Sequence, residues 1–227
     1  MHRRDFIGTT IAASVALFGA GRVGSAESAS LTPLPKRGRT KVAFMLGEGA
    51  NVIDTAGPWE VFQDTVIEHR DAFELYTVAP TEDLVRMTGG LTVKPTYSVK
   101  NAPQPNLIVI PAHKSTDDSI EWLRSASAGT DVTLSVCTGA FQLAKAGLLK
   151  GVPATTHHEF WDEFQKKYPD IELRRGLRFV DSGRIATAGG LTSGIDLALH
   201  IVARYFGVET AGATAAYMEY SSDAWRA

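Results

Sequence analysis

Apolar runs and segments of helical periodicity alternate along the chain from about residue 40 onward. The uninterrupted apolar runs have the length and β-branched content of buried strands, and they cover 41–46, 73–79, 106–111, 132–136 and 152–156. Apolar residues at three- and four-residue spacing predict helices, which cover 58–70, 119–126, 139–146, 158–167, 193–206 and about 210–220. Glycine-containing turns predict two hairpins, at 85–95 and 177–188.

This alternation predicts a parallel sheet with helices on both of its faces. We find no internal repeat and no linker in this region, and we therefore expect a single domain over 41–227. Sites in such sheets lie at the carboxyl ends of the strands. Three segments are expected there, L-G-E-G-A-N-V-I-D, I-P-A-H-K-S and V-C-T-G, and folding would bring them together.

The first residues have a different composition from the rest. M-H-R-R-D-F-I-G is followed by a short apolar stretch of small residues and then by G-S-A-E-S-A. Arg3 and Arg4 before Phe6 resemble a twin-arginine export signal, with a Sec signal or a lipid-facing anchor as alternatives. We predict a signal peptide over 1–26, a flexible leader over 27–40 and a periplasmic protein. The apolar stretch is too short to span a membrane, so no stable membrane association is expected after cleavage.

Charge and cysteine content narrow the function classes. The formal net charge of the 227 residues is −2 and the pI is about 6.3, which gives no electrostatic footprint for nucleic acid. The chain has one cysteine, Cys137. In an oxidising compartment a lone cysteine has no internal partner, so it is buried and inert, paired with another molecule, or functional.

Cys137 lies in S-V-C-T-G-A, between an apolar strand and a predicted helix. A side chain at such a turn is lifted out of the sheet over helix N–H groups, which favour a thiolate and can stabilise an oxyanion. The alternative is a small buried apolar residue at the end of a strand. The T-G turn and the predicted export favour a nucleophile.

The stretch V-C-T-G-A-F-Q-L-A-K-A-G-L-L-K-G-V-P-A-T-T-H-H resembles the signature of the ThiJ/PfpI superfamily. V-I-D-T-A-G-P-W-E-V-F and I-A-T-A-G-G-L-T-S-G-I-D-L-A-L-H fit the same family, and the resemblance covers nearly all of 41–220. It looks closest to the isonitrile hydratase branch, which is similar to the amidase-like domains of AraC-type regulators. The resemblance implies a flavodoxin-like three-layer α/β sandwich of the class I glutamine amidotransferase type, a homodimer and no cofactor.

The resemblance also implies roles for individual residues. Cys137 is expected to be the nucleophile, with Asp54 near its sulfur; the alternative for Asp54 is a helix N-cap. Thr138 and Gly139 are expected to offer backbone N–H groups to the site, although turn chemistry explains a threonine equally well. His157 is expected near the cysteine, where it orients or protonates an intermediate, or else it is a strand-end histidine bonded to backbone.

The chain departs from the family pattern after the strand-ending proline. Ala112 and His113 replace the usual pair of glycines, one of which lends an N–H to the oxyanion hole. We expect an N–H to be offered there still and the His113 side chain to enter the pocket. Glu48 is a second, weaker candidate acid. A metal at His157, His158 and Glu159 is not expected, because adjacent side chains point apart and no further ligand cluster is present.

These residues predict an exported enzyme that adds water to a small carbon electrophile, of the isonitrile hydratase type. We expect Cys137 to be ionised and Asp54 protonated, so that the pair shares one negative charge. Deglycase, glyoxalase-like or amidase chemistry is the alternative among enzymes. A ligand-binding or redox-sensing domain is the non-catalytic alternative. The chain ends soon after Trp225, which leaves no room for a helix-turn-helix, and a small molecule is the expected partner.

Overall fold

The computed structural model describes residues 33–35 and 38–227. The expected signal peptide at 1–26 lies outside the described residues, as does much of the leader, so export stays a prediction. Within the described part of the leader, the Leu34 N–H donates a hydrogen bond to the carbonyl of Arg204 (3.0 Å), and its side chain packs against the core. No helix in the described residues has the length and apolar character needed to cross a membrane.

A seven-stranded sheet with the order β10-β11-β9-β8-β1-β4-β7 forms the centre of the fold. All neighbours are parallel except β10 and β11, which form an antiparallel hairpin. The strands are β1 (Thr40–Met45), β4 (Phe73–Ala79), β7 (Tyr97–Ser98), β8 (Leu107–Ile110), β9 (Val132–Val136), β10 (Phe179–Asp181) and β11 (Ile185–Ala188). Every residue of β8 and β9 is buried, which explains why these strands are continuous apolar runs rather than alternating patterns.

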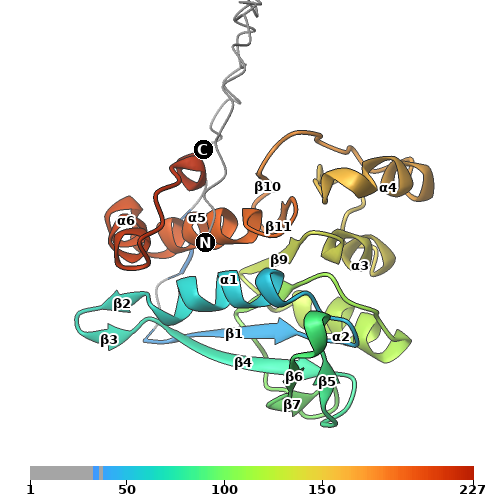
Figure 1. Ribbon diagram of the computed structural model, residues 1–227, viewed down its shortest axis with the longest axis horizontal. Helices are drawn as coiled ribbons and strands as arrows, with labels where there is room; N and C mark the ends of the chain where they lie inside the picture. Colours follow the sequence, from blue (N-terminus) through green and yellow to red (C-terminus); the bar gives the residue numbers. More distant parts are fainter. Residues whose placement is uncertain (1–32, 36–37) are drawn as a thin grey trace, which may run out of the picture.

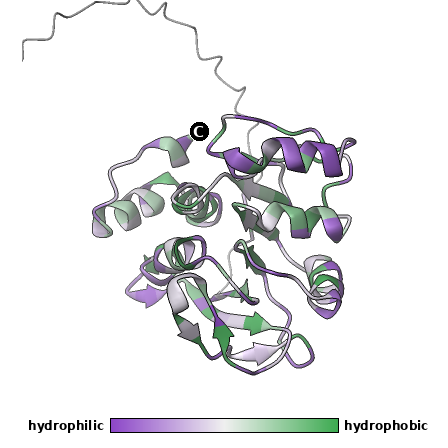
Figure 2. Ribbon diagram, turned by 45° about the vertical axis from the view of Figure 1, so that its right-hand side comes forward, coloured by the Kyte–Doolittle hydropathy of each residue, from purple (hydrophilic) through white to green (hydrophobic). Residues whose placement is uncertain are grey.

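Helices cover both faces of the sheet (Figure 1). One core cluster joins the sheet to α1 (Val52–Gln63), α5 (Ser193–Phe206) and α6 (Val208–Tyr217). The other joins it to α2 (Asp117–Ser127), α3 (Gly139–Lys145) and α4 (Trp161–Lys167). Figure 2 shows hydrophobic residues on the strands and a mostly hydrophilic α4. The expected α/β sandwich with a mostly parallel sheet is therefore confirmed.

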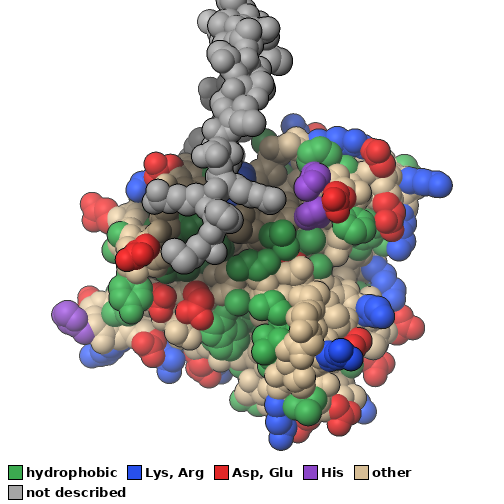
Figure 3. Space-filling view, in the orientation of Figure 1, with side chains coloured by type: hydrophobic (Ala, Val, Ile, Leu, Met, Phe, Trp, Pro, Cys, Tyr) green, Lys and Arg blue, Asp and Glu red, His purple; other side chains and the backbone are tan. Residues whose placement is uncertain are grey.

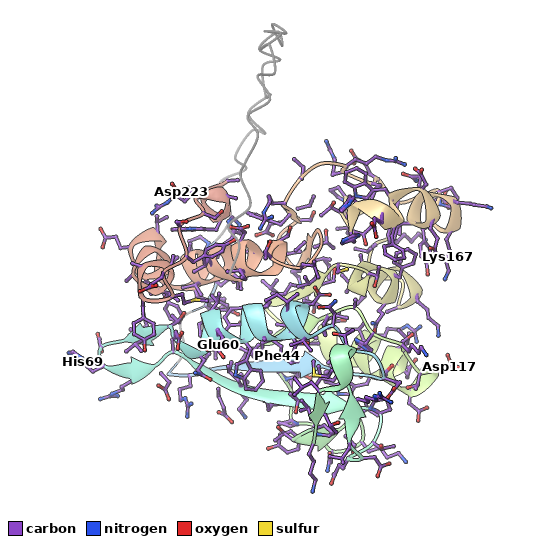
Figure 4. All side chains as sticks on the ribbon, in the orientation of Figure 1. Phe44, Glu60, His69, Asp117, Lys167 and Asp223 are labelled. Carbon is purple, nitrogen blue, oxygen red and sulfur yellow. The ribbon has the colours of Figure 1, made fainter. Side chains whose placement is uncertain are left out.

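Short elements complete the chain. Two small hairpins pair β2 (Val66–Ile67) with β3 (Arg70–Asp71) and β5 (Val85–Arg86) with β6 (Thr92–Val93). The 3₁₀ turns are η1 (Thr88–Gly90), η2 (His158–Phe160) and η3 (Ala224–Arg226). In Figure 4 the labelled charged residues Asp117, Lys167 and Asp223 lie at the outside of the fold, and Glu60 of α1 is exposed. Phe44 of β1 is instead fully buried, with its ring 4.9 Å from that of Trp59.

Two predicted elements differ from the structure. The helix expected over 58–70 begins at Val52, because Asn51 caps it, and Pro58 lies inside the helix rather than in its first turn. It ends at Gln63, and the rest of the expected helix is the hairpin of β2 and β3. The strand expected over 152–156 is only a single bridge between Ala154 and Leu173. Its regular pairing is interrupted because the backbone N–H of Thr155 donates to the side-chain hydroxyl of Thr187 (2.8 Å) instead.

Candidate functional site

The candidate site lies at the carboxyl ends of β8, β9 and β11 and at the start of α1. Cys137 follows β9 directly and is 7% exposed. Its φ of 59° is in the left-handed region, which costs an ordinary side chain roughly 1–3 kcal/mol. Backbone strain of this kind persists only where surrounding contacts hold it, and it is typical of functional sites.

Two neighbouring segments hold the backbone of Cys137. Its N–H donates to the carbonyl of Gly189, 2.8 Å away, at the end of β11. Its carbonyl accepts a hydrogen bond from the hydroxyl of Thr156, also at 2.8 Å. The thiol is thus fixed at the strand-to-helix turn where the sequence predicts it.

Gly139 begins α3, and its backbone lies closer to the end of β8 than a residue with a side chain would allow. A Cβ at this position would overlap with the carbonyl oxygen of Ile110 and would lie 3.3 Å from that of Pro111. Glycine at this position therefore brings the start of α3, and with it the Cys137 turn, against the end of β8.

Asp54 is the third residue of α1, and its side chain is fully buried. The cap of this helix is Asn51, whose side-chain oxygen accepts from the N–H groups of Ile53 (3.1 Å) and Asp54 (3.3 Å). The helix-cap interpretation of Asp54 is therefore wrong. Its Oδ2 instead accepts the N–H of Ala112 at 3.1 Å. Its Oδ1 is also buried, and the Leu191 N–H and the Cys137 thiol are the further hydrogen-bond partners of the Asp54 carboxyl group.

Asp54 and Cys137 influence each other's protonation. Burial raises the pKa of Asp54 to about 6, although the N–H groups of Ala112 and Leu191 and the Cys137 thiol partly oppose this. Burial, and then the charge of Asp54, raise the pKa of the Cys137 thiol to about 12, while the N–H groups of Thr138 and Leu191 act in the opposite direction. Both pKa values are thus raised chiefly by removal from water.

The charge distribution in this pair corrects the expectation from sequence. A thiolate beside a protonated Asp54 was expected from the helix N-terminus at Cys137. The structure favours a neutral thiol beside an ionised carboxylate, because the low-polarity surroundings and the charge of Asp54 outweigh the N–H donors at the thiol. These pKa directions favour a single negative charge on the pair near neutral pH, with Asp54 rather than Cys137 as its carrier.

Ala112 and His113 have different roles from each other. The Ala112 N–H is already used by Asp54, so it is not free for a substrate anion. The His113 ring packs against Gly47, where a Cβ would lie 2.5 Å from its Cδ2, and its Nδ1 lies 2.9 Å from the carbonyl of Pro111. Burial lowers the pKa of His113 to about 4, so its ring is neutral. The His113 backbone N–H donates to no group in the described part of the chain and is the available donor of this pair.

The other predicted residues differ in burial and in the groups that they contact. Thr138 is half-buried and makes no side-chain cap bond, so its contribution is the N–H beneath the thiol. His157 is half-buried, and its ring packs on Gly190. Glu48 is exposed and lines a separate cavity of about 230 Å³. Among the described residues, no group of three or more His, Cys, Asp or Glu side chains could hold a metal ion.

Two residues of the candidate site were not predicted from the sequence. Leu191 has a φ of 54°, and its N–H lowers the pKa of both Asp54 and Cys137. Thr156 fixes the Cys137 carbonyl. Residue type does not indicate which backbone N–H groups act as donors, although G-G-L before a helix predicts a tight turn. The role of Thr156 could not be predicted, because its hydrogen bond to the Cys137 carbonyl joins two segments that are separate in sequence.

The fold and this site define the class of protein. The chain belongs to the DJ-1/PfpI family, whose model matches residues 40–204. The resemblance noted from the motifs is therefore confirmed. Isonitrile hydratase of Pseudomonas putida is 30% identical over 189 residues, which make up 80% of this chain and 78% of that protein.

The chain is also similar to part of a transcriptional regulator and to a solved structure of the same family. The HTH-type transcriptional regulator CdhR of Pseudomonas aeruginosa is 28% identical over 173 residues, 74% of this chain, and the match spans only 51% of the regulator. The crystal structure of a ThiJ/PfpI family protein from Pseudomonas syringae has a TM-score of 0.71 at 25% identity. That match covers 84% of this chain and 78% of the other.

Proposed function

We propose that this protein is an exported enzyme of the isonitrile hydratase type, which adds water to the terminal carbon of a small isonitrile. The observation that carries the proposal is the buried pair of Asp54 and Cys137, in a chain 30% identical to isonitrile hydratase of Pseudomonas putida. In covalent catalysis the nucleophile generally lies beside a base that can accept its proton.

The charge distribution of the pair suggests the order of steps. The Asp54 carboxylate accepts the thiol proton as the Cys137 sulfur bonds to the terminal carbon of R–N≡C. Asp54 then delivers this proton to the same carbon, which gives the thioimidate R–N=CH–S–Cys137. Water adds to that carbon, the carbon–sulfur bond breaks, and the sulfur regains a proton. The products are R–NH–CHO and the free thiol, so that one water is consumed in each turnover.

Backbone donors supply the electrostatic part of the mechanism. The N–H groups of Thr138 and Leu191 act on the thiol, and the N–H of His113 is unused. Donors fixed in a dry site stabilise developing negative charge strongly, since they need no reorganisation during the reaction. We assign the N–H groups of Thr138 and Leu191 to the negative charge that develops when sulfur attacks and when the thioimidate collapses.

A non-catalytic ligand-binding domain is the second candidate, and the similarity to the regulator CdhR favours it. Redox sensing has weaker support. Sensor cysteines have a low pKa and are accessible to solvent, whereas Cys137 is buried and its thiol pKa is raised.

Exposure to a small alkyl isonitrile separates these candidates. We expect release of the N-substituted formamide and, after rapid acid quenching, a mass increase on Cys137 equal to one isonitrile. Cys137→Ser should give neither product nor adduct. A stable adduct without formamide would indicate binding or trapping rather than catalysis, and the absence of both would reject Cys137 as the nucleophile.

The pH dependence of kcat/KM should follow Asp54. Because the base must be ionised, activity should fall about tenfold for each pH unit below the Asp54 pKa of about 6. No alkaline decline from thiol ionisation is expected up to pH 9, because the Cys137 pKa is raised to about 12. A profile that is flat from pH 5 to 8 would contradict Asp54 as the base.

A further inference from the structure

Hydrogen bonds from two neighbouring segments hold the backbone of Cys137. The hydroxyl of Thr156 holds the Cys137 carbonyl from one side, and the carbonyl of Gly189 holds the Cys137 N–H from the other. The residue after Thr156 is His157, and the residue after Gly189 is Gly190. These two residues meet, since a Cβ on Gly190 would overlap with the His157 ring and lie 2.8 Å from its Nε2.

The His157 ring is itself held in place. Its Nδ1 accepts the N–H of Glu159 at 3.3 Å. The ring also stacks on His158, with centroids 4.4 Å apart, and lies edge-on to Phe160 at 5.8 Å. An Nδ1 that accepts a hydrogen bond carries no hydrogen, so the neutral ring has its hydrogen on Nε2.

The contact with the His157 ring explains why residue 190 is a glycine, although its backbone φ does not require one. Gly190 is not among the residues with positive φ, unlike the next residue, Leu191, whose φ is 54°. Leu191 is 41% exposed and has no buried side chain to hold it in this uncommon conformation. The Ser193 N–H donates to the Gly190 carbonyl at 3.1 Å, and the His157 ring packs on the Cα of the same residue, so both contacts restrain the peptide leading into Leu191.

We infer that His157 is a positioning residue, whose ring holds the Gly190–Leu191 peptide so that the Leu191 N–H points at the Asp54–Cys137 pair. It acts by packing rather than by proton transfer. This inference rests on the proposed function, in which Cys137 is the working nucleophile, but it concerns the thiol itself and can be measured without turnover.

The test is the rate of Cys137 alkylation in the full domain between pH 7 and 9. In this range, below the Cys137 pKa of about 12, the rate is proportional to the fraction of thiolate. A change in thiol pKa slows iodoacetamide and the bulkier N-ethylmaleimide equally, whereas a change in accessibility does not. His157→Ala should slow both reagents about tenfold, because loss of one N–H donor to a charged sulfur raises the thiol pKa by about one unit. His157→Phe keeps a ring on Gly190 and should slow them by only about twofold or less.

Substitution of the other partner provides an independent test. Gly190→Ala places a methyl group in the His157 ring and should also slow alkylation by both reagents. In the double variant Gly190→Ala with His157→Ala, the methyl meets no ring, so the two effects should not add. His69→Ala removes an exposed histidine at the turn between β2 and β3, labelled in Figure 4, and should leave both rates unchanged.

Each outcome supports or overturns the inference. Equal slowing by His157→Ala and His157→Phe would show that imidazole chemistry, not packing, matters. An unchanged rate in His157→Ala, together with faster alkylation in Asp54→Asn, would reject the positioning role and leave Cys137 as the nucleophile. Failure of Cys137 to alkylate in the wild type at any pH would reject the proposed function itself. If His157→Ala does not fold, Gly190→Ala and His157→Phe still decide the question.

Discussion

Replacing Asp54 with Asn should lower isonitrile hydration about 1000-fold, within the range for loss of a general acid–base group. Asparagine has the same shape and can accept the Ala112 N–H through its carbonyl oxygen. It can neither take the thiol proton nor return it to carbon. The measurement is kcat/KM for formamide production, compared with the thermal midpoint of the same preparation.

The stability of this variant should not fall. Burial raises the folded-state pKa of Asp54 to about 6, above its ordinary value of 3.8. The folded state therefore binds a proton more tightly than the unfolded state. The stability contributed by protonated Asp54 is fully present below pH 3.8 and is lost as pH rises through about 6. Asparagine is neutral throughout, so at pH 7 the variant should unfold at the same temperature as the wild type or higher.

Asn51→Ala is the matched control on the same helix. It removes the side-chain cap of α1, which should cost about 1 kcal/mol of folding stability. It leaves both Asp54 and Cys137 in place, so activity per folded molecule should change only slightly. Equal losses of activity in the two variants would mean that α1 matters to the site only as a scaffold.

The sequence was sufficient for those parts of the site where residue type and local order decide the structure. An apolar strand that ends in C-T-G before a helical pattern predicts the elbow at Cys137, and the structure has that elbow. The role of Asp54 beside the sulfur came from family resemblance. Its alternative as a cap was plausible only because the helix was expected to begin at Pro58, and the true cap at Asn51 places Asp54 inside the first turn.

The remaining features depend on distances between segments that are far apart in sequence. Whether the thiol or the carboxyl carries the negative charge depends on burial, which no single segment reveals. The N–H of Leu191 belongs to the backbone and would be present whatever the side chain. Figure 3 shows hydrophobic side chains near the middle of one face, among polar and charged surface.

The largest expected effect on folding is that of Gly139→Ala. The added Cβ would overlap with the backbone carbonyl of Ile110 and lie 3.3 Å from that of Pro111. A backbone oxygen in the sheet cannot rotate away as the end of a side chain can, so α3 must shift from β8. We expect a loss of about 3 kcal/mol of unfolding free energy, as for other overpacked core positions. Because α3 carries the Cys137 turn, the folded fraction should also lose most of its thiol alkylation.

Gly212→Ala on α6 tests whether any alanine in place of a helical glycine has the same effect. Its Cβ would meet nothing closer than Nη2 of Arg226 at 3.5 Å, an ordinary contact. Alanine is favoured over glycine in a helix interior by about 1 kcal/mol, so this variant should be more stable than the wild type. Urea unfolding of the two variants should therefore give changes of opposite sign. Similar stabilities for both would show that the start of α3 can move away from β8, and that the Cys137 turn is held by its hydrogen bonds to Gly189 and Thr156 alone.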